Sequence, residues 1–229
     1  MKIKQNYLIE ANNLVKFYKD GETLIRILDN INICISYGEI ISIVGISGSG
    51  KSTLLQIIGL IDKPNSGSLK ICNHDINYQD NSNINYLKKF KISFIYQTHH
   101  LISELNILDN VAMPLLLHRK NFLEARKAAY FELEKVGLLK KGHLYPYQLS
   151  VGEKQRVSFA RALITQPICI LADEPTGSLD YENSQHIIEL FKYINNTKHT
   201  SIIIVTHDNK LSKIADNKFS INNGKLTKL

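Results

Sequence analysis

The sequence has few cysteines, and none is placed for a disulfide scaffold. Its 229 residues include only Cys34, Cys72 and Cys169, an odd number with no two in a CxxC pair. This pattern argues against a zinc site and is typical of a protein from a reducing compartment. Cys34 and Cys169 stand in apolar stretches, where a free cysteine behaves as a small hydrophobic residue, so we expect both to be buried.

The sequence also lacks a long apolar run. The longest, at residues 111–117 and 202–205, are far shorter than the ~20 residues that a helix needs to cross a bilayer. Residues 1–13 contain no continuous apolar core, so we do not expect a signal peptide. We therefore expect a soluble cytoplasmic protein or one that is peripheral to a membrane.

A third absence is a block of like charges. The chain has 28 Lys and Arg against 21 Asp and Glu, a net charge of +7, without a run of five or more like charges. A nucleic-acid-binding arm is therefore not expected, and we predict no nucleic-acid partner. A solvated, mildly basic surface is the simplest interpretation; an anionic ligand and an anionic membrane face are the alternatives.

The pattern of apolar residues predicts an α/β chain with a helical block in its middle. The first part is rich in strands, and an apolar strand at residues 39–44 is directly followed by a glycine-rich stretch. Strands are predicted at residues 7–10, 25–36, 39–44, 67–72, 91–96, 168–172, 201–206 and, as an edge strand, 218–222. Helices are predicted at residues 51–60, 107–117, 122–137, 151–165 and 182–195.

The glycine-rich stretch is a phosphate-binding loop. Residues 45–52 read Gly-Ile-Ser-Gly-Ser-Gly-Lys-Ser and fit G-x-x-x-x-G-K-[ST] between a strand and a helix, which is the context the motif requires. Its backbone N–H groups and the helix N-terminus attract phosphate oxygens. Lys51 is expected to reach the β- and γ-phosphates of ATP, and the Ser52 hydroxyl to ligate Mg²⁺. The predicted nucleotide contacts here are Gly45, Ile46, Ser47, Gly48, Ser49, Gly50, Lys51, Ser52 and Thr53.

Polar residues at three further strand ends complete a hydrolytic site. Asp173 and Glu174 end the apolar strand at 168–172, so Asp173 is predicted to hold Mg²⁺ and Glu174 to activate the attacking water as general base. His207 follows the strand at 201–206, where it can face the γ-phosphate. Gln97 follows the strand at 91–96 and can reach Mg²⁺ or the water. The adjacent pair His99 and His100 is interpreted as part of a loop, not as a metal site.

The motif order resembles one family. Leu149-Ser150-Val151-Gly152-Glu153, here called the signature motif, lies between the phosphate loop and LADEPTGSLD. In this order the motifs are similar to those of the nucleotide-binding domains of ABC (ATP-binding cassette) proteins, and the resemblance covers essentially the whole chain. A kinase or GTPase is disfavoured because no NKxD guanine-reading motif follows a suitable strand.

The resemblance assigns further roles. It implies that Tyr18 stacks on adenine, that Gln97 and His207 are catalytic, and that Asp180 belongs to the loop that follows LADEPTG. It also implies that Ser150 and Gly152 complete the ATP site of a second copy, in a head-to-tail homodimer with ATP at the interface. A serine and a glycine at a helix N-terminus suit such an anion contact.

The implied fold is an ABC-type P-loop NTPase of the α/β class. It has a RecA-like core with an antiparallel β subdomain, formed by residues 1–97 and 166–229, and an inserted α-helical subdomain, formed by residues 98–165. The departure from the family is Val151, where a glycine is usual. Its β-branched side chain is expected to crowd the partner's γ-phosphate or to stiffen the helix start, and so to slow the site.

Within the family, the segments at 94–101 and 110–117 are similar to those of lipoprotein-releasing ATPases. Macrolide- or peptide-exporter ATPases and the cell-division ATPase FtsE belong to the same branch and stay open as alternatives. The resemblance implies integral membrane permease subunits of the LolC/LolE type as partners, at the cytoplasmic face of the inner membrane. It places their docking surface at residues 97–117; a plain amphipathic core helix is the other interpretation of that segment.

Overall fold

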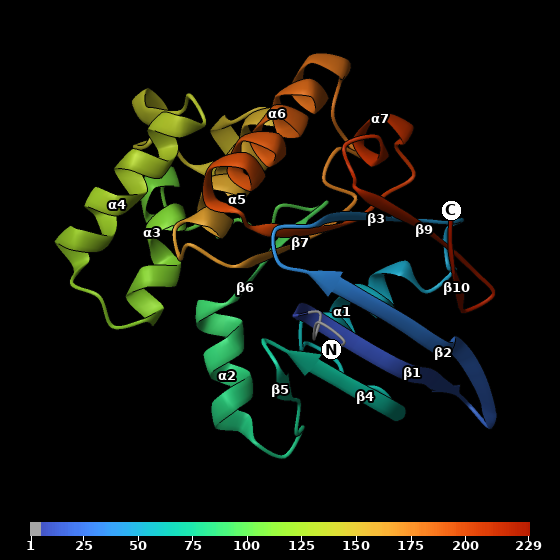
Figure 1. Cartoon of the computed structure of the whole chain (residues 1–229). Helices are drawn as coiled ribbons and strands as arrows, with labels where there is room; N and C mark the ends of the chain where they lie inside the picture. Colours follow the sequence, from blue (N-terminus) through green and yellow to red (C-terminus); the bar gives the residue numbers. More distant parts are fainter. Residues whose placement is uncertain (1–5) are drawn as a thin grey trace.

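The computed structural model describes residues 6–229 and contains two sheets with helices around them (Figure 1). The first five residues of the stretch that argued against a signal peptide lie outside the described part. Among the described helices, none is long and apolar enough to span a membrane. The three cysteines are unpaired.

The antiparallel sheet has the order β2-β1-β4-β5 among the described residues. Its main pair is a long hairpin, in which a turn at Gly21 with φ 59° joins two strands whose pairing is offset by bulges. Because of this hairpin, the strand expected at residues 7–10 is much longer than predicted. The bounds are β1 (Tyr7–Asp20), β2 (Thr23–Ser36), β4 (Ser66–Ile71) and β5 (His74–Asp75).

The second sheet forms the centre of the molecule, with the order β10-β9-β3-β8-β7-β6 within residues 6–229. All neighbouring strands in it run parallel except β10, which pairs antiparallel with β9. The strand predicted as an edge is therefore internal, because β10 continues the sheet beyond it. The bounds are β3 (Ile40–Val44), β6 (Ile92–Tyr96), β7 (Cys169–Asp173), β8 (Ser201–Val205), β9 (Asn217–Asn222) and β10 (Lys225–Lys228).

The predicted helices all form, with ends that shift by a few residues, and two helices were missed. One is α2, which is capped by the Asp80 side chain; its Asn-rich sequence has little helix propensity of its own. The other is the short α7. The bounds are α1 (Lys51–Ile58), α2 (Asn81–Phe90), α3 (Ile107–Leu117), α4 (Phe122–Lys135), α5 (Val151–Leu163), α6 (Tyr181–Lys198) and α7 (Asn209–Ser212), with 3-10 turns at Leu139–Lys141 and Pro146–Gln148.

The central sheet separates two apolar cores. Along β8, Ile202 and Ile204 join the core that packs against α3, α4, α5 and α6, whereas Ile203 and Val205 join the core shared with α1 and the antiparallel sheet. Successive side chains of a strand point to opposite faces, so an all-apolar strand such as β8 serves both cores. This burial on both faces fixes the strand ends that carry the polar residues.

The two cysteines that were expected to be buried differ in their exposure, and the helical block is continuous with the rest of the fold. Cys169 is buried as expected, but Cys34 is exposed, because the apolar residues of β2 alternate and Cys34 lies on the outer face. Helices α3, α4 and α5 stand together at one side of the molecule (Figure 1), yet their core continues without a break into α6 and the sheet. The division into subdomains at residues 97 and 166 stays a prediction.

Candidate functional site

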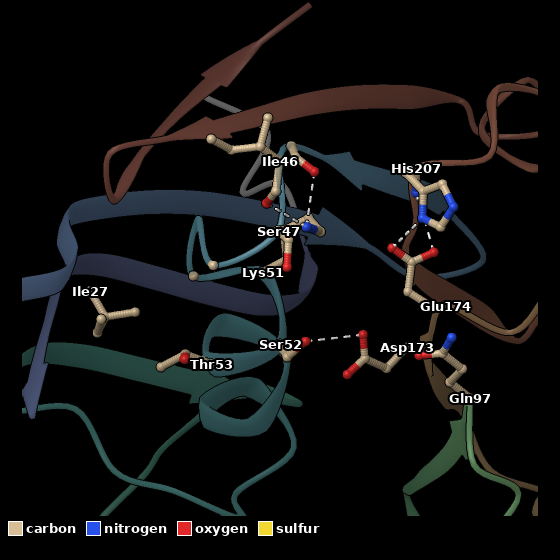
Figure 2. Close-up of a pocket in the computed structure, with 13 residues that line it drawn as sticks. Ile27, Ile46, Ser47, Lys51, Ser52, Thr53, Gln97, Asp173, Glu174 and His207 are labelled. Atoms are coloured by element: carbon tan, nitrogen blue, oxygen red, sulfur yellow. Dashed lines mark hydrogen bonds and ion pairs between the residues drawn. The ribbon is translucent and has the colours of Figure 1, made fainter. Parts of the chain in front are cut away.

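The carboxyl ends of the parallel strands β3, β6, β7 and β8 bring the predicted hydrolytic residues around one pocket of about 700 Å³ (Figure 2). In a parallel sheet these ends share one edge, and ligands bind there. Residues separated by more than 150 positions in the sequence meet in this way. The pocket is lined by Ile27, Gly45, Ile46, Ser47, Gly48, Gly50, Lys51, Ser52, Thr53, Gln97, Asp173, Glu174 and His207.

The phosphate loop is shaped by its glycines and closed by its lysine. Gly50 caps α1 with φ 102°, a conformation that favours glycine, and a Cβ there would lie 2.8 Å from the Ile27 carbonyl oxygen. The buried Lys51 donates from Nζ to the carbonyl oxygens of Gly45 and Ile46, at 2.9 Å each. Its positive charge is thus held inside the loop, next to the N-terminus of α1.

Ser52 and Asp173 face each other across the pocket (Figure 2). The Ser52 hydroxyl donates to Asp173 Oδ1 at 3.1 Å. Burial raises the pKa of Asp173 and so does the charge of Glu174; the hydrogen bond from Ser52 and the charge of Lys51 offset this only in part, so the pKa lies above its ordinary range. A hydroxyl and a carboxylate are the hard oxygen ligands that Mg²⁺ prefers. Together with Lys51, they fit a Mg²⁺-bound polyphosphate.

Glu174 is held in one orientation by its neighbours. Its backbone has φ 46°, a left-handed conformation that is uncommon for a non-glycine residue. Oε2 accepts from the Thr206 hydroxyl at 3.2 Å and from the His207 backbone N–H at 3.3 Å, and Oε1 lies 2.9 Å from His207 Nδ1. The predicted base and the predicted histidine are therefore in direct contact. Thr206, which sequence reasoning missed, is buried at the end of β8 and left no signal in the sequence.

Gln97 lies at the end of β6 and faces the same pocket (Figure 2). A Cβ at Gly177 would lie 3.0 Å from its Nε2, so the loop after β7 approaches the amide closely because it has a glycine there. His99 and His100 follow in a loop in which both residues have positive φ. Their carbonyl oxygens accept from Arg161 of α5, at 2.6 Å each. Two hydrogen bonds thus connect the loop after Gln97 to α5.

Tyr18 does not line the pocket of Figure 2. Its hydroxyl donates to Asp62 Oδ2 at 2.7 Å, and the Lys16 ammonium lies 4.8 Å from the centre of its ring. Lys16 also pairs with Asp62 at 2.7 Å. Burial alone would raise the pKa of Asp62, but the hydrogen bonds from Lys16, Tyr18 and the Lys63 amide hold it below its usual range. Sequence reasoning missed this cluster and Ile27, because their partners are distant in the sequence.

The signature motif forms the start of α5 and also lies outside this pocket. The Ser150 hydroxyl accepts from the Glu153 N–H at 3.3 Å, and the Glu153 carboxylate accepts from the Ser150 N–H at 3.0 Å, which is a capping box. Val151 is 45% exposed and Gly152 is buried. A Cβ at Gly152 would lie 2.3 Å from Asn183 Cγ, so the glycine permits close packing of α5 against α6.

Asp180 caps α6 and positions that same asparagine. Its carboxylate accepts from the Asn183 backbone N–H at 2.8 Å and from the Asn183 side chain at 2.9 Å. Asp180 and Gly152 therefore touch a common residue, although neither lines the pocket around Lys51. The structure thus divides the predicted site residues into one group at the strand ends and another at the starts of α5 and α6.

Known proteins resemble this chain in both sequence and fold. The ABC transporter family matches residues 28–177. The lipoprotein-releasing system ATP-binding protein LolD of Bordetella avium is 44% identical over 218 residues, which are 95% of this chain and 95% of that protein. LolD of Rickettsia bellii is 42% identical over 221 residues, 96% of this chain and 98% of that protein.

Solved structures with the same fold include the ATP-binding cassette MJ0796. Its dimeric post-hydrolysis state bound to ADP and Pi has a TM-score of 0.90 and 37% identity, and the match covers 96% of this chain and 98% of that chain. CbiO1 of Clostridium perfringens, part of the ABC transporter complex cbiONQ, has a TM-score of 0.85 and 28% identity, with 97% and 87% covered. These matches confirm the expected fold class.

Proposed function

This chain belongs to the ABC transporter family, and from that premise we propose that it is the ATP-hydrolysing subunit of a complex that releases lipoproteins from the inner membrane. ATP with Mg²⁺ is its cofactor pair, and ATP hydrolysis is its activity. The observation that carries the finer proposal is the 44% identity to a lipoprotein-releasing ATPase along nearly the full length of both chains. The relatives reported above do not favour the exporter or FtsE-like alternatives.

The residues around the pocket suit the binding step. Lys51 is already placed inside the loop that would surround the β- and γ-phosphates, and the N-terminus of α1 adds partial positive charge. Ser52, Asp173 and Gln97 would hold Mg²⁺. When bound, this ion neutralises charge on the phosphate oxygens. Tyr18 would present the exposed part of its ring to adenine, while its hydroxyl stays fixed by Asp62.

Glu174 is proposed as the general base for hydrolysis. Its carboxylate accepts hydrogen bonds from Thr206 and His207, so it has one fixed orientation toward the pocket. In that orientation it takes a proton from the attacking water as the water approaches the γ-phosphate. The His207 ring, 2.9 Å from Glu174, would orient the base and contact the γ-phosphate.

Ser150, Gly152 and Asp180 are proposed to act in a second copy of the chain. They lie outside this chain's own pocket, yet Ser150 and Gly152 stand at a helix N-terminus that suits phosphate. A head-to-tail homodimer would place them against the γ-phosphate held by the partner's Lys51. The dimeric structure of the related MJ0796 cassette supports a dimer of this chain.

A groove of about 500 Å³ is proposed as the docking site for the permease. It runs between α2, β6, α3 and α5, and its apolar lining includes Phe94, Met113 and Pro114. The helix α3 therefore has a core face and a groove face, so both interpretations of residues 107–117 apply to parts of it. Arg161 also lines this groove and donates to the loop that follows Gln97, which offers a physical connection from the permease to the ATP site.

The hydrolytic assignment is tested by Glu174→Gln. Removing a general base lowers turnover by about a hundredfold or more, while ATP binding should persist because Lys51 and Ser52 are unchanged. ATP hydrolysis, ATP affinity and ATP-dependent dimerisation would be measured side by side. Glu104→Gln, on an exposed loop residue, is the matched control and should behave like the parent. Normal hydrolysis by Glu174→Gln would exclude Glu174 as the base.

The transport assignment is tested by isolating the membrane partner and measuring lipoprotein release from spheroplasts. We expect permease subunits with large extracytoplasmic domains to co-purify with the chain, and ATP-dependent release that Glu174→Gln abolishes. Recovery of a single-chain exporter permease without lipoprotein release would favour the exporter alternative instead.

A further inference from the structure

We propose that the corner formed by the end of α2, the α3–α4 turn and the first turns of α4 binds directly to an anionic lipid membrane surface. This corner is called the basic tip and comprises Lys88, Lys89, Arg119, Lys120, Leu123 and Lys127. It adjoins the groove proposed for the permease, whose edge Lys88 and Lys89 share, and lies outside the ATP site. Only its orientation toward the bilayer rests on the proposed function; its lipid binding is a property of the chain alone.

The parts of the basic tip come from different elements but are held together. The rings of Phe90, at the end of α2, and His118, directly after α3, are 4.6 Å apart. Burial and the nearby charge of Lys89 both lower the pKa of His118, which places Lys89 at the same corner. In Figure 1 the lower ends of α3 and α4 lie at the outer left of the molecule, next to the upper end of α2.

The basic side chains of this corner are exposed, and none has an ion-pair partner within residues 6–229. This distinguishes them from Lys16, Lys135 and Lys141, each of which pairs with a carboxylate. Arg126 is nearby, but Asp109 pairs with it at 3.1 Å. The exposed acid of the first turn of α4 is Glu124. The corner therefore has a net positive charge that no ion pair within the described residues neutralises.

Large apolar side chains protrude among these charges. Leu123 is 75% exposed, Leu117 is 65% exposed and Phe122 is 50% exposed. Leu123 and Lys127 stand one helical turn apart on the outer face of α4. Basic residues interspersed with exposed leucine and phenylalanine are typical of surfaces that lie in the interface of an anionic membrane.

A membrane is favoured over an acidic protein because of the shape of this corner. Phe122 and Leu123 protrude from the start of α4 and line no part of the groove, whereas Leu117, at the end of α3, lies at the groove's edge. Protein partners need a surface of complementary shape to bury such side chains at the packing density of an interface core. Lipid headgroups and acyl chains adapt to a protruding corner, and the lysines contribute as mobile point charges.

The test is flotation of the purified full-length chain with vesicles. Vesicles of phosphatidylethanolamine and phosphatidylglycerol should bind it, and binding should weaken as salt is raised; pure phosphatidylcholine vesicles should not. The double variant Lys120→Glu/Lys127→Glu should lower partitioning by about tenfold or more, and Leu123→Ser severalfold. Lys213→Glu/Lys228→Glu makes the same change in charge at exposed, unpaired lysines after α7 and at the end of β10, on the right of Figure 1, and should bind like the parent.

Several results would overturn the proposal. One is no binding to the anionic vesicles. A second is equal loss in the Lys213→Glu/Lys228→Glu control, which would mean that the net charge of the chain alone decides. A third is unchanged vesicle binding by the basic-tip variants; if these variants then fail to co-purify with the permease, the corner docks a protein. ATP hydrolysis by the isolated chain should be normal in all of these variants. A failure of the lipid-binding proposal can therefore be distinguished from a failure of the proposed ATPase and lipoprotein-release function.

Discussion

Two adjacent carboxylates, Asp173 and Glu174, have different surroundings, and we propose different roles for them in ATP hydrolysis. Asp173 is the last residue of β7; its carboxylate accepts a hydrogen bond from the Ser52 hydroxyl and is attracted by the charge of Lys51. Glu174 turns away in a left-handed conformation and receives hydrogen bonds from the end of β8. The backbone turn between them separates the acid proposed to bind Mg²⁺ from the acid proposed as the base.

The raised pKa of Asp173 leads to a prediction about stability. A folded-state pKa above the unfolded value means that the folded chain binds the proton more tightly. The resulting stability is present at low pH and is lost as pH rises through the folded pKa, so ionised Asp173 destabilises the free chain at neutral pH. Asp173→Asn should therefore raise the melting temperature at neutral pH, and lower ATP hydrolysis by about a hundredfold or more.

The pH dependence provides the control for this variant. As pH falls into the range where Asp173 itself becomes protonated, the difference in melting temperature between Asp173→Asn and the parent should shrink. Thermal unfolding followed by circular dichroism at several pH values measures it. A variant that is less stable than the parent at neutral pH would show that the Ser52 contact outweighs the cost of burial.

Val151 is the residue at which the signature motif departs from the family. Its side chain is nearly half exposed at the first position of α5, where a partner's γ-phosphate is expected to approach. Val151→Gly should increase the ATPase rate of the assembled complex severalfold. Val151→Ala separates the two causes, because it removes the β-branch but keeps the helix start ordered. An unchanged or lower rate in Val151→Gly would contradict the crowding hypothesis.

At the scale of secondary-structure elements, α5 and α6 begin in the same way and touch at their starts. Ser150 caps α5 and Asp180 caps α6, each accepting a hydrogen bond from the backbone N–H three residues later. The side chain of Asn183 fills the space beside Gly152. The signature motif and the loop before α6 are therefore positioned relative to each other by direct packing, and we expect them to move together.

Gly152→Ala tests this packing. The added methyl group would lie 2.3 Å from Asn183 Cγ, so we expect a loss of about 1–3 kcal/mol in the free energy of unfolding. Urea unfolding of Gly152→Ala, Asn183→Ala and the double variant completes a mutant cycle. Gly152→Ala should lower the free energy of unfolding much less in the Asn183→Ala background than in the parent. An equal loss of unfolding free energy in both backgrounds would show that the Asn183 side chain is not what the added methyl group meets.

At the scale of the whole molecule, the two groups of residues proposed for the ATP site lie apart in one chain. Lys51, Asp173 and Glu174 surround the pocket at the strand ends, while Ser150 and Gly152 are outside it. A site made of both groups would need a second copy of the chain, which is the head-to-tail homodimer that we propose.

Mixed dimers can distinguish this arrangement from a site within one chain. Lys51→Ala removes the phosphate contact, and Ser150→Asp keeps a good helix cap but adds a charge that repels phosphate. With one change in each chain, a head-to-tail dimer retains one intact site. With both changes in the same chain, it retains none. We expect about half of the parent ATPase rate in the first dimer and a loss of about tenfold or more in the second.

Tandem-linked chains would keep the composition of each mixed dimer fixed while ATP hydrolysis is measured. Single-change homodimers should both be inactive and serve as controls. Activity in the dimer with both changes in one chain, and not in the other, would show that each chain completes its own site.

The sequence by itself determined the local chemistry of this protein. The phosphate loop and the two acids at the end of β7 depend on residues that are close together in the chain, so spacing and strand–helix context were enough to predict them. The all-apolar strands likewise predicted a buried parallel sheet. The Asn-rich α2 and the added strand β10 were missed because packing, not local propensity, decides them.

Only the tertiary structure decided which of these residues meet. The contacts of Glu174 with Thr206, Tyr18 with Asp62, and Gly152 with Asn183 join positions that are between 31 and 44 residues apart, and no periodicity encodes them. The order of strands places Ser52, Gln97, Asp173 and His207 on one edge of the sheet and leaves Ser150 outside their pocket. Such contacts follow from the burial of both faces of the sheet, a property of the whole fold that no short stretch of sequence contains.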